Sequence, residues 1–506
     1  METSLGLGLP LIISWFLYSV LLISIYVGAT ATYNLFFHPL RHYPGPKSWA
    51  ATYLPWSLSV LRGHPHIDIL ELHKRYGDVV RLSPSELSFS HTDAWREIYG
   101  HLKRGEVEND KDPRLEAAGD QSIVSAPRER HGQMRRLLSH GFSARAMAEQ
   151  QPLMDRYIDL FIRRLREKGQ GGKARLDSTK WFEWTTFDII GDLSFGVPFG
   201  CLQNAASHPW VETLFDSLGV VPIQQIIYNL PLYSVLKAFY FMLFVPRHIM
   251  TKRQTSQLFS EETLKKRMSL ATDRPDYVDA MLRGEGEMKL TDIELRDNAT
   301  LITTAGSETT ASALTATIFL LGTHPDVLAR LEAEVRSAFR KDQEINVNSV
   351  QNLPYMLAVL KESMRVHPPV AISIPRVTPP GGARIAGTHV AEGAIVGVWQ
   401  YAAYHNPAKF RHPDSFIPER WLEDYQGFEN DERGLCQHFS VGPRNCIGMN
   451  LAYAEMRLIL ARIIFNFDIS LAPESRTWTS GQKLFFFWKK PPLWTYYKPR
   501  KEGTTS

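Results

Sequence analysis

The sequence contains few cysteines, only three among 506 residues. Cys201, Cys436 and Cys446 are odd in number and show none of the spacings of a zinc site or a disulfide framework. A fold held together by disulfides is therefore excluded, and a reducing compartment is expected for the main body. The stretch FSVGPRNCIGMNLA places Cys446 at the start of an apolar helical pattern with no cysteine nearby, so this thiol needs another explanation.

A strong net charge is also missing. Lys and Arg number 57 against 53 Asp and Glu, which leaves a formal net charge of +4. This balance gives no reason to expect a nucleic-acid partner. Apolar residues make up 44% of the chain, which is ordinary for a globular protein with a large core.

Charged residues are absent from Thr3 to Phe37. Within this segment, residues 11–31 are apolar and long enough to cross the ~30 Å hydrocarbon core of a bilayer. A cleaved signal peptide would have a basic start, a shorter apolar core and a small-residue cleavage site. The start carries only Glu2, so an uncleaved anchor is favoured. Arg41 and Lys47 follow it, which places the body in the cytosol by the positive-inside rule.

The sequence therefore divides into three parts. Residues 1–37 form the anchor, and residues 38–46, rich in proline, form a stiff hinge that cannot continue the helix. No comparable linker, internal repeat or low-complexity tract follows, so residues 47–506 are expected to form one domain. The glycosylation motif at 298–300 falls inside a predicted helix and is interpreted as chance.

Helical patterns dominate this domain, and strand patterns are few. Residues 78–90 predict two short strands around a turn, preceded by a helix over 66–76 that Gly77 ends. Thr291 and Glu294 form a capping box that opens a long helix over 291–322. Further helices are predicted at 325–339, 354–366 and 447–466. The expected fold is mainly α with small β-sheets.

Two interpretations of Cys446 remain open from its local sequence. A single cysteine is most often a small buried hydrophobic residue. However, a helix start favours a thiolate, Arg444 adds positive charge, and Gly442 and Gly448 allow close backbone approach. A thiolate held in this way is a good ligand for a soft metal or for haem iron.

Two further patterns carry their own alternatives. Glu362 and Arg365 share one helix face, either as an exposed ion pair worth less than ~1 kcal/mol or, with Arg420, as a buried structural cluster. In AGSETT, Gly306 weakens a helix interior by ~1 kcal/mol relative to alanine. The segment is either a tight helix crossing or a distorted turn in which Glu308 and Thr309 relay protons.

Scattered positive charges form the fourth pattern. His131 and Arg135 lie on one face of a predicted helix, and Arg376 follows PPVAISIP. Together with Arg444 these residues could neutralise a dianionic cofactor. For any one of the arginines, a solvated surface charge is the alternative.

Taken together, AGSETT, ESMR, PERW and FSVGPRNCIG, in this order, resemble the cytochrome P450 family of haem-thiolate monooxygenases. The resemblance covers nearly the whole chain after the anchor. NLFFHPLRHYPGP and FEWTTFDIIGDLSFGVPFG are similar to the fungal microsomal subset that includes trichothecene-type hydroxylases. The resemblance implies a cytochrome P450 fold behind an N-terminal transmembrane helix.

The resemblance also implies roles for individual residues. Cys446 is the expected axial thiolate of haem b, with Phe439 packed beside it. The expected haem propionate contacts are His131, Arg135, Arg376 and Arg444. Glu362, Arg365 and Arg420 match the family's structural triad, and Glu308 with Thr309 matches its acid–alcohol pair.

The implied function is a membrane-anchored monooxygenase of the endoplasmic reticulum that hydroxylates or epoxidises a hydrophobic small molecule. No flavin domain is expected on the chain, so electrons from NADPH must arrive through a cytochrome P450 reductase, which the segment 128–145 is expected to dock. The alternatives are a haem-thiolate isomerase or dehydratase and a non-catalytic haem protein. The expected substrate walls are residues 110–126, 213–250, the helix face before Ala305, 370–374 and the turn near Leu484.

Overall fold

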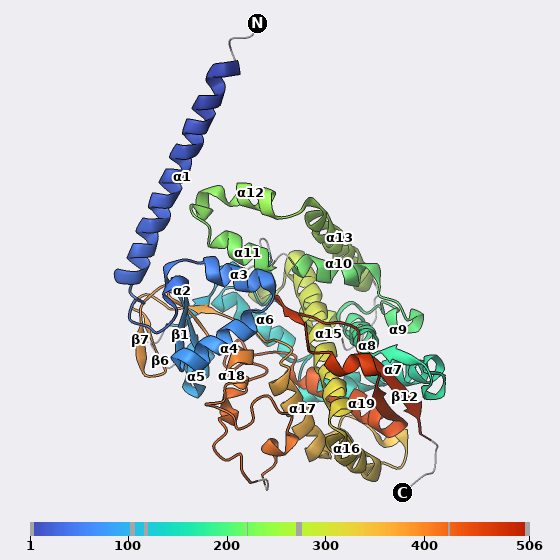
Figure 1. The fold of residues 1–506 in the computed structure, drawn as a ribbon. Coiled ribbons are helices and arrows are strands. Elements are labelled where there is room, and N and C mark those ends of the chain that lie inside the picture. Colours follow the sequence, from blue (N-terminus) through green and yellow to red (C-terminus); the bar gives the residue numbers. More distant parts are fainter. Residues whose placement is uncertain are drawn as a thin grey trace.

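The structure is a computed structural model and describes residues 5–101, 107–115, 120–219, 221–269, 276–423 and 426–500. It is mainly helical with small sheets, as predicted (Figure 1). Two of the expected substrate walls extend beyond the described residues, at 116–119 and at 220.

A single apolar helix, α1 (Leu5–Phe36), projects from one side of the body (Figure 1). Its portion Leu17–Phe36 is long and apolar enough to cross a membrane, and only 6% of that window is buried. The helix therefore ends five residues later than the apolar run that was predicted to span the bilayer.

The segment 38–46 contains no helix, and hydrogen bonds fasten it and the end of α1 to the body. The buried Arg81 donates through Nη1 to the Asn34 carbonyl at 3.1 Å, and its amide donates to the Pro44 carbonyl at 2.8 Å. Asn34 Nδ2 donates to the Ala51 carbonyl, and the Tyr43 hydroxyl donates to the His389 carbonyl, both at 2.8 Å. The end of α1 is thus held directly against a strand of the main sheet.

The predicted strands are present as β1 (Val79–Ser83) and β2 (Glu86–Phe89), an antiparallel pair. They begin a five-stranded sheet of order β1-β2-β8-β5-β3. A separate three-stranded sheet has the order β4-β12-β9, and two further strand pairs form hairpins. The remaining strands are β3 (Asp110–Lys111), β4 (Arg175–Asp177), β5 (Arg376–Val377), β6 (Ala383–Ile385), β7 (Thr388–Val390), β8 (Ile395–Gly397), β9 (Phe467–Leu471), β10 (Lys483–Leu484), β11 (Trp488–Lys489) and β12 (Trp494–Pro499).

The predicted helices are confirmed as α4 (Pro65–Tyr76), α15 (Asp292–Thr323), α16 (Pro325–Ala338), α17 (Pro354–Val366) and α19 (Met449–Asn466). The others are α2 (Lys47–Ala51), α3 (Leu54–Arg62), α5 (Thr92–Tyr99), α6 (Arg128–Ser139), α7 (Ala144–Lys168), α8 (Ser178–Phe195), α9 (Cys201–Asn204), α10 (Pro209–Leu218), α11 (Val221–Tyr228), α12 (Tyr233–Phe244), α13 (Arg247–Ser269), α14 (Tyr277–Leu282) and α18 (Gln400–Tyr404).

Helix α15 passes through the centre of the body and packs closely against α8 (Figure 1). Its capping box forms as predicted, with Thr291 Oγ1 accepting from the Glu294 amide and the Glu294 carboxylate accepting from the Thr291 amide. Asn298 is fully buried and accepts from the Ile123 amide at 2.9 Å. This asparagine is therefore closed to glycosylation in the folded protein, in agreement with its interpretation as a chance motif.

Candidate active site

Cys446 lies in the loop that leads into α19. Its amide donates to the Phe439 carbonyl at 2.9 Å, which folds residues 439–446 into a tight loop. Gly442 has a φ of +78°, and a Cβ at this position would stand 1.9 Å from the Tyr99 carbonyl oxygen. Only glycine fits there, because the loop presses against the end of α5. The Phe439 ring packs 5.1 Å from the Tyr453 ring of α19.

The surroundings of the Cys446 thiol act on its pKa in opposite directions. Burial raises the pKa, while the Gly448 amide and the Arg135 guanidinium lower it. The net direction is upward, so the predicted thiolate is not stabilised by the protein alone. A bound metal ion would deprotonate this thiol directly. The side chain itself is exposed, although protein surrounds the thiol.

The predicted charge beside Cys446 comes from a different arginine. Arg135 donates to the backbone carbonyl and the side-chain oxygen of Asn445, at 2.5 and 2.6 Å, and so reaches the cysteine loop from α6. Arg444 instead pairs with Glu108 at 3.2 Å and donates to the Ala126 carbonyl. The prediction that Arg444 stabilises the thiolate of Cys446 is therefore wrong. Arg444 nevertheless lies near the other cations around His131.

Positive charges converge around His131. Burial, together with the positive charges of Arg444, Arg135, Lys111 and Arg376, lowers the pKa of His131 to about 4, so its ring is neutral near pH 7. Arg376 is 8% exposed, and its guanidinium donates only to the Pro375 carbonyl within the described part of the chain. A buried guanidinium without a carboxylate partner is costly.

These observations test whether the residues fit a haem group. A cysteine that is open on one side can ligate iron, and a cluster of buried cations next to it can hold two propionates. Their positions on α6, β5 and the cysteine loop bring together four residues from three segments that are far apart in the sequence. The expected contacts Cys446, Arg135, Arg376 and His131 therefore fit the group.

The region of the predicted acid–alcohol pair is a regular helix. Helix α15 continues through residues 305–310 without interruption, so of the two alternatives the distorted turn is not formed. A Cβ on Gly306 would lie 3.0 Å from Ile190 Cδ1 of α8, which shows that this glycine serves a close helix crossing. Thr309 Oγ1 donates to the Ala305 carbonyl at 2.6 Å. Ala305 is exposed within this otherwise largely buried stretch.

The Glu308 carboxylate has different partners from the Thr309 hydroxyl. It forms an ion pair with the Lys490 ammonium and accepts a hydrogen bond from Ser312 Oγ at 3.0 Å. Burial raises the pKa of Glu308, and Lys490 opposes that shift. The sequence places Glu308 and Thr309 side by side, but in the structure their polar atoms make separate contacts. A proton relay between them requires the Glu308–Lys490 contact to open.

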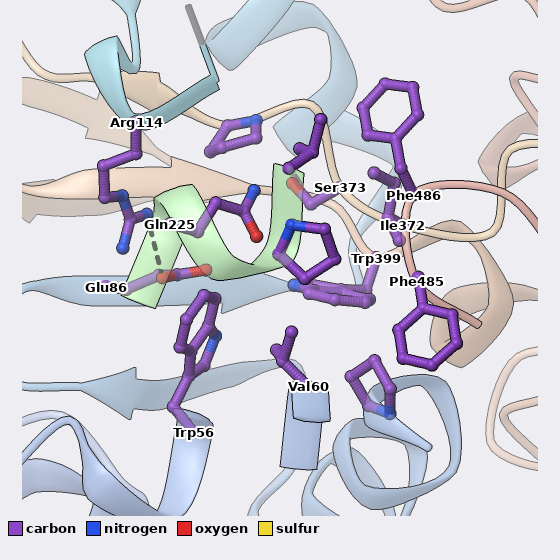
Figure 2. Close-up of a pocket in the computed structure, with 14 residues that line it drawn as sticks. Trp56, Val60, Glu86, Arg114, Gln225, Ile372, Ser373, Trp399, Phe485 and Phe486 are labelled. Atoms are coloured by element: carbon purple, nitrogen blue, oxygen red, sulfur yellow. Dashed lines mark hydrogen bonds and ion pairs between the residues drawn. The ribbon is translucent and has the colours of Figure 1, made fainter. Parts of the chain in front are cut away.

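Four of the five expected substrate walls meet in one pocket (Figure 2). Arg114 comes from residues 110–126, Val221 from 213–250, Ile372 from 370–374 and Phe485 from the turn near Leu484. The fifth wall, the face of α15 before Ala305, does not line this pocket.

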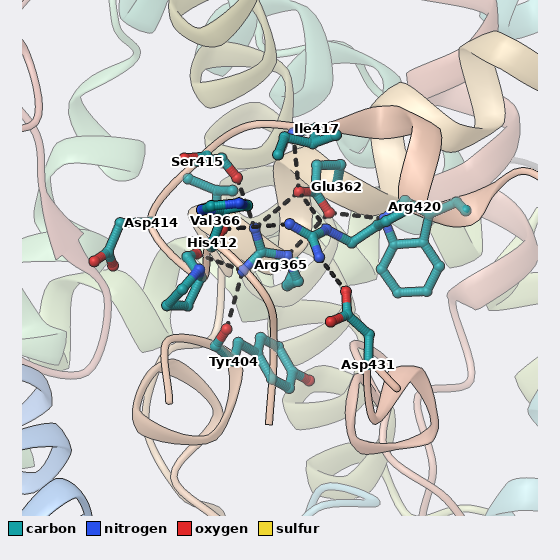
Figure 3. A network of polar contacts seen from close by, with 12 residues as sticks. Glu362, Arg365, Val366, Tyr404, His412, Asp414, Ser415, Ile417, Arg420 and Asp431 are labelled. Atoms are coloured by element: carbon teal, nitrogen blue, oxygen red, sulfur yellow. Dashed lines mark hydrogen bonds and ion pairs between the residues drawn. The ribbon is translucent and has the colours of Figure 1, made fainter. Parts of the chain in front are cut away.

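The structural triad forms a fully buried network (Figure 3). Arg365 makes two hydrogen bonds to the Glu362 carboxylate, at 2.9 and 2.8 Å, and Arg420 Nε adds a third at 2.9 Å. Arg365 also donates to the backbone carbonyls of Tyr404, Pro413 and Ser415. The network thus ties the segment before the cysteine loop to α17, and the alternative of an exposed ion pair is wrong.

Four residues of these sites were not found by sequence reasoning. Asp431 pairs with Arg420, and Trp421 Nε1 donates to Glu362 at 2.8 Å. Asn445 holds Arg135, and Lys490 holds Glu308. Trp421 and Asn445 directly follow motif residues and could have been suspected, but Asp431 and Lys490 have no local signal.

Comparison with known proteins agrees with this geometry. The family model described as Cytochrome P450 matches residues 44–495. The chain is 44% identical over 479 residues to Trichothecene C-15 hydroxylase of Fusarium sporotrichioides, covering 94% of this chain and 96% of the relative. It is 43% identical over 478 residues to Averantin hydroxylase of Dothistroma septosporum, covering 93% and 89% respectively.

The match spans nearly the whole described body and includes the cysteine loop, the buried triad and α15. These two relatives are identical to this chain at more than two positions in five over almost their full length, and they therefore share its fold. Their names are those of hydroxylases, which agrees with the convergence of Cys446 and the cation cluster. The chain belongs to the cytochrome P450 family and is a haem-thiolate monooxygenase.

Proposed function

We propose that this protein is anchored in the endoplasmic reticulum membrane by α1 and hydroxylates or epoxidises a hydrophobic small molecule in fungal secondary metabolism. Electrons from NADPH reach it through a separate cytochrome P450 reductase. The relatives named for trichothecene and averantin hydroxylation support this class of reaction. The observation that carries the proposal is that Cys446 meets the half-buried Arg135 of α6, next to the buried Arg376 of β5.

The chain's own residues contribute positioning and proton control. Arg135, Arg376 and His131 would hold the haem edge, and Cys446 would ligate its iron. Bound haem supplies the activation of dioxygen, favoured by electron donation from the thiolate. Thr309 offers a hydroxyl on α15, and Glu308 is a buried acid that Lys490 restrains. Because the ring of His131 is neutral, it adds no further positive charge to the arginines around it.

Replacing Thr309 by alanine should uncouple electron supply from product formation. The variant lacks the hydroxyl that would hold a proton donor in place, while Cys446 and the cation cluster are untouched. We expect normal haem content and substrate binding, but several-fold less product per NADPH consumed and more hydrogen peroxide. Product, NADPH and peroxide are measured together in a reaction with reductase.

Thr315→Ala is the matched control for this variant, because Thr315 makes the same hydrogen bond to the carbonyl four residues earlier, at 2.7 Å, farther along α15. Its coupling should equal that of the wild type. Full coupling in Thr309→Ala would remove this hydroxyl from the mechanism.

The reductase-docking face needs a correction to its expected residues. Arg130 is bound to the capping carboxylate Glu294 at 2.5 and 2.6 Å, and Arg128 lies 3.4 Å from Glu108. Arg130 is therefore part of the fold, and reversing its charge would disturb the start of α15. Arg136 and Arg145 are exposed on the same segment and are the better candidates for contact with an acidic flavoprotein.

Charge reversal at Arg136 and Arg145 should slow reduction by the reductase several-fold at low salt. Steering between charged surfaces weakens beyond a Debye length of about 10 Å at 0.1 M salt. The rate should therefore depend less steeply on salt in the variant, while the carbon monoxide spectrum stays unchanged. Arg247→Glu at the start of α13 serves as the control and is compared with each of the two single reversals. Equal rates and salt slopes in both variants would place the docking face elsewhere.

The decisive experiment for the reaction class is reconstitution with reductase, NADPH and extracts of a strain that lacks this gene. Product that contains one oxygen atom from labelled dioxygen supports a monooxygenase. Conversion that continues without dioxygen would instead support the isomerase or dehydratase alternative. The absence of both product and NADPH consumption would support a non-catalytic haem protein. Untargeted comparison of metabolites between deletion and parent strains then identifies the substrate.

A further inference from the structure

The pocket formed by the expected substrate walls has one strongly polar end (Figure 2). Arg114 of the short helix η1 (Pro113–Leu115), Glu86 of β2 and Gln225 of α11 lie there with Trp56 of α3, and Trp399 lies across from them. The volume of the whole pocket is about 30 Å³, which has room for one or two groups of the size of a water molecule. The pocket can therefore accept a single oxygen substituent, whereas a ring that carries it must lie outside.

Acidic groups outnumber the cation at this end of the pocket. Arg114 binds Asp112 through Nη2 at 2.6 Å and through Nε at 2.8 Å, and it binds Glu86 through Nη2 at 3.1 Å. The three side chains are at most 6% exposed. One guanidinium thus faces two carboxyl groups. A ligand with its own negative charge would meet an excess of acidic groups and lose its hydration in the same step.

Three hydrogen-bond donors in this pocket lack an acceptor. Arg114 Nη1, Trp56 Nε1 and Trp399 Nε1 are buried and have no partner in the described part of the chain. The Arg114 guanidinium lies 5.7 Å from the centre of the Trp56 ring, so two of these donors are neighbours. In Figure 2 the indole nitrogens of Trp56 and Trp399 both face the middle of the pocket. Guanidinium and indole groups can only donate, so an oxygen acceptor on a bound molecule would satisfy them.

Other buried tryptophans of the protein show the usual arrangement. Trp95 Nε1 donates to the Leu435 carbonyl at 2.9 Å, and Trp488 Nε1 donates to the Pro368 carbonyl at 2.8 Å. Buried donors are nearly always paired in this way, and unpaired ones point to a water or a ligand. Their concentration at one end of a pocket lined by substrate walls distinguishes this site from a packing defect.

We propose that this polar end is a subsite for an uncharged oxygen acceptor on the substrate, such as a ketone, ester or hydroxyl oxygen. This inference rests on the proposed function, because it assumes that the pocket belongs to the substrate cavity. The donors Trp56 and Trp399 select the oxygen, while Glu86 and Asp112 select against a carboxylate. The substrate is then a neutral molecule that already carries an oxygen function when it reaches this enzyme.

The test compares three rigid probes on the haem-loaded full-length protein by calorimetry. The probes are 2-adamantanone, 2-methyleneadamantane, in which CH₂ replaces the oxygen, and 1-adamantanecarboxylate. We expect the ketone to bind about tenfold more tightly than the methylene compound, as one buried hydrogen bond predicts. The carboxylate should bind no more tightly than the methylene compound. In a Trp56→Phe, Trp399→Phe double variant the tenfold ratio should fall below about threefold, with the methylene affinity unchanged.

Several outcomes would overturn the subsite. Equal affinity of ketone and methylene compound in the wild type would mean that the donors serve water only. A tenfold ratio that survives in the double variant would place the oxygen elsewhere, and tight binding of the carboxylate would make the site anionic in its preference. Trp95→Phe is the matched control, because it removes a paired donor. It should lower the melting temperature and keep the ratio, whereas Trp56→Phe should keep the melting temperature.

Failure of the subsite can be distinguished from failure of the proposed function. Calorimetry requires neither NADPH nor reductase, so discrimination between the probes without any turnover would contradict only the monooxygenase proposal. Conversely, oxygenated product from an enzyme that does not discriminate between the probes would contradict only the subsite.

Discussion

Replacing Cys446 by alanine is expected to abolish the strongly red-shifted Soret band that the reduced wild-type protein shows with carbon monoxide. That band reports a thiolate on haem iron, and the described structure brings the exposed sulfur of Cys446 beside the cluster of Arg135, Arg376 and His131. Without the sulfur, the cations still attract the propionates, so haem can remain bound with a different axial ligand. The measurement is the difference spectrum together with the haem content of the purified variant.

The other two cysteines provide the controls. Cys201 is 1% exposed, and burial raises the pKa of its thiol to about 12, so it is an inert residue of the core. Burial likewise raises the pKa of Cys436, which lies near the triad. Alanine at either position should leave the band in place. An unchanged band in Cys446→Ala would remove Cys446 from iron ligation.

Removing the Glu362 carboxylate should have the largest effect on folding. Glu362→Ala removes the carboxylate partner of the buried Arg365 and leaves Arg420 with Asp431 alone. Trp421 Nε1 and the Ile417 amide also lose their acceptor. Breaking a buried ion pair by removing one partner costs about 3–5 kcal/mol. This is a large part of the roughly 5–15 kcal/mol that stabilises a typical domain. We expect little folded protein and no thiolate spectrum, measured by urea unfolding and by haem content.

Glu71→Gln is the control for this variant, because Glu71 forms an exposed pair with Lys74 and should change stability by less than about 1 kcal/mol. Equal stability of Glu362→Ala and wild type would mean that the network does not support the fold.

The contribution of Glu362 should also depend on pH. Burial alone would raise the pKa of Glu362, but Arg365 and Arg420 together lower it below its ordinary value of 4.5. A lowered folded pKa means that the carboxylate stabilises the folded state fully above the unfolded pKa. This contribution is lost as the pH falls through the folded pKa.

Local sequence patterns predicted the helices well, because a helix is encoded by neighbouring residues. The capping box of Thr291 and Glu294 and the stop at Gly77 both involve residues within one turn of the chain. The loop around Cys446 was also predictable from its own residues. Gly442 is required there because any side chain at this position would collide with the Tyr99 carbonyl. The Glu362 triad was correct because ESMR and PERW together supplied all three of its charges.

Contacts between distant segments could not be predicted in the same way. Lys490 meets Glu308 across 182 residues, and Arg130 meets Glu294 across 164. Neither partner shows a periodic pattern that indicates the other, because such pairs depend on how helices pack. For this reason Arg444 was expected to act on the thiol rather than to pair with Glu108, and the pair of Arg130 with Glu294 was not foreseen.

The attachment of α1 to the main sheet has a consequence for how the protein meets its electron donor. If α1 crosses the bilayer as proposed, the bond from Arg81 to the Asn34 carbonyl leaves the body little freedom to rotate about its anchor. A reductase in the same membrane then reaches this protein by lateral diffusion in two dimensions. The tilt of the docking face relative to the membrane is already fixed. Such confinement raises the effective concentration of the two proteins without any added contact between them. Arg81 of β1 thereby influences how often the reductase meets the distant docking face in a productive orientation.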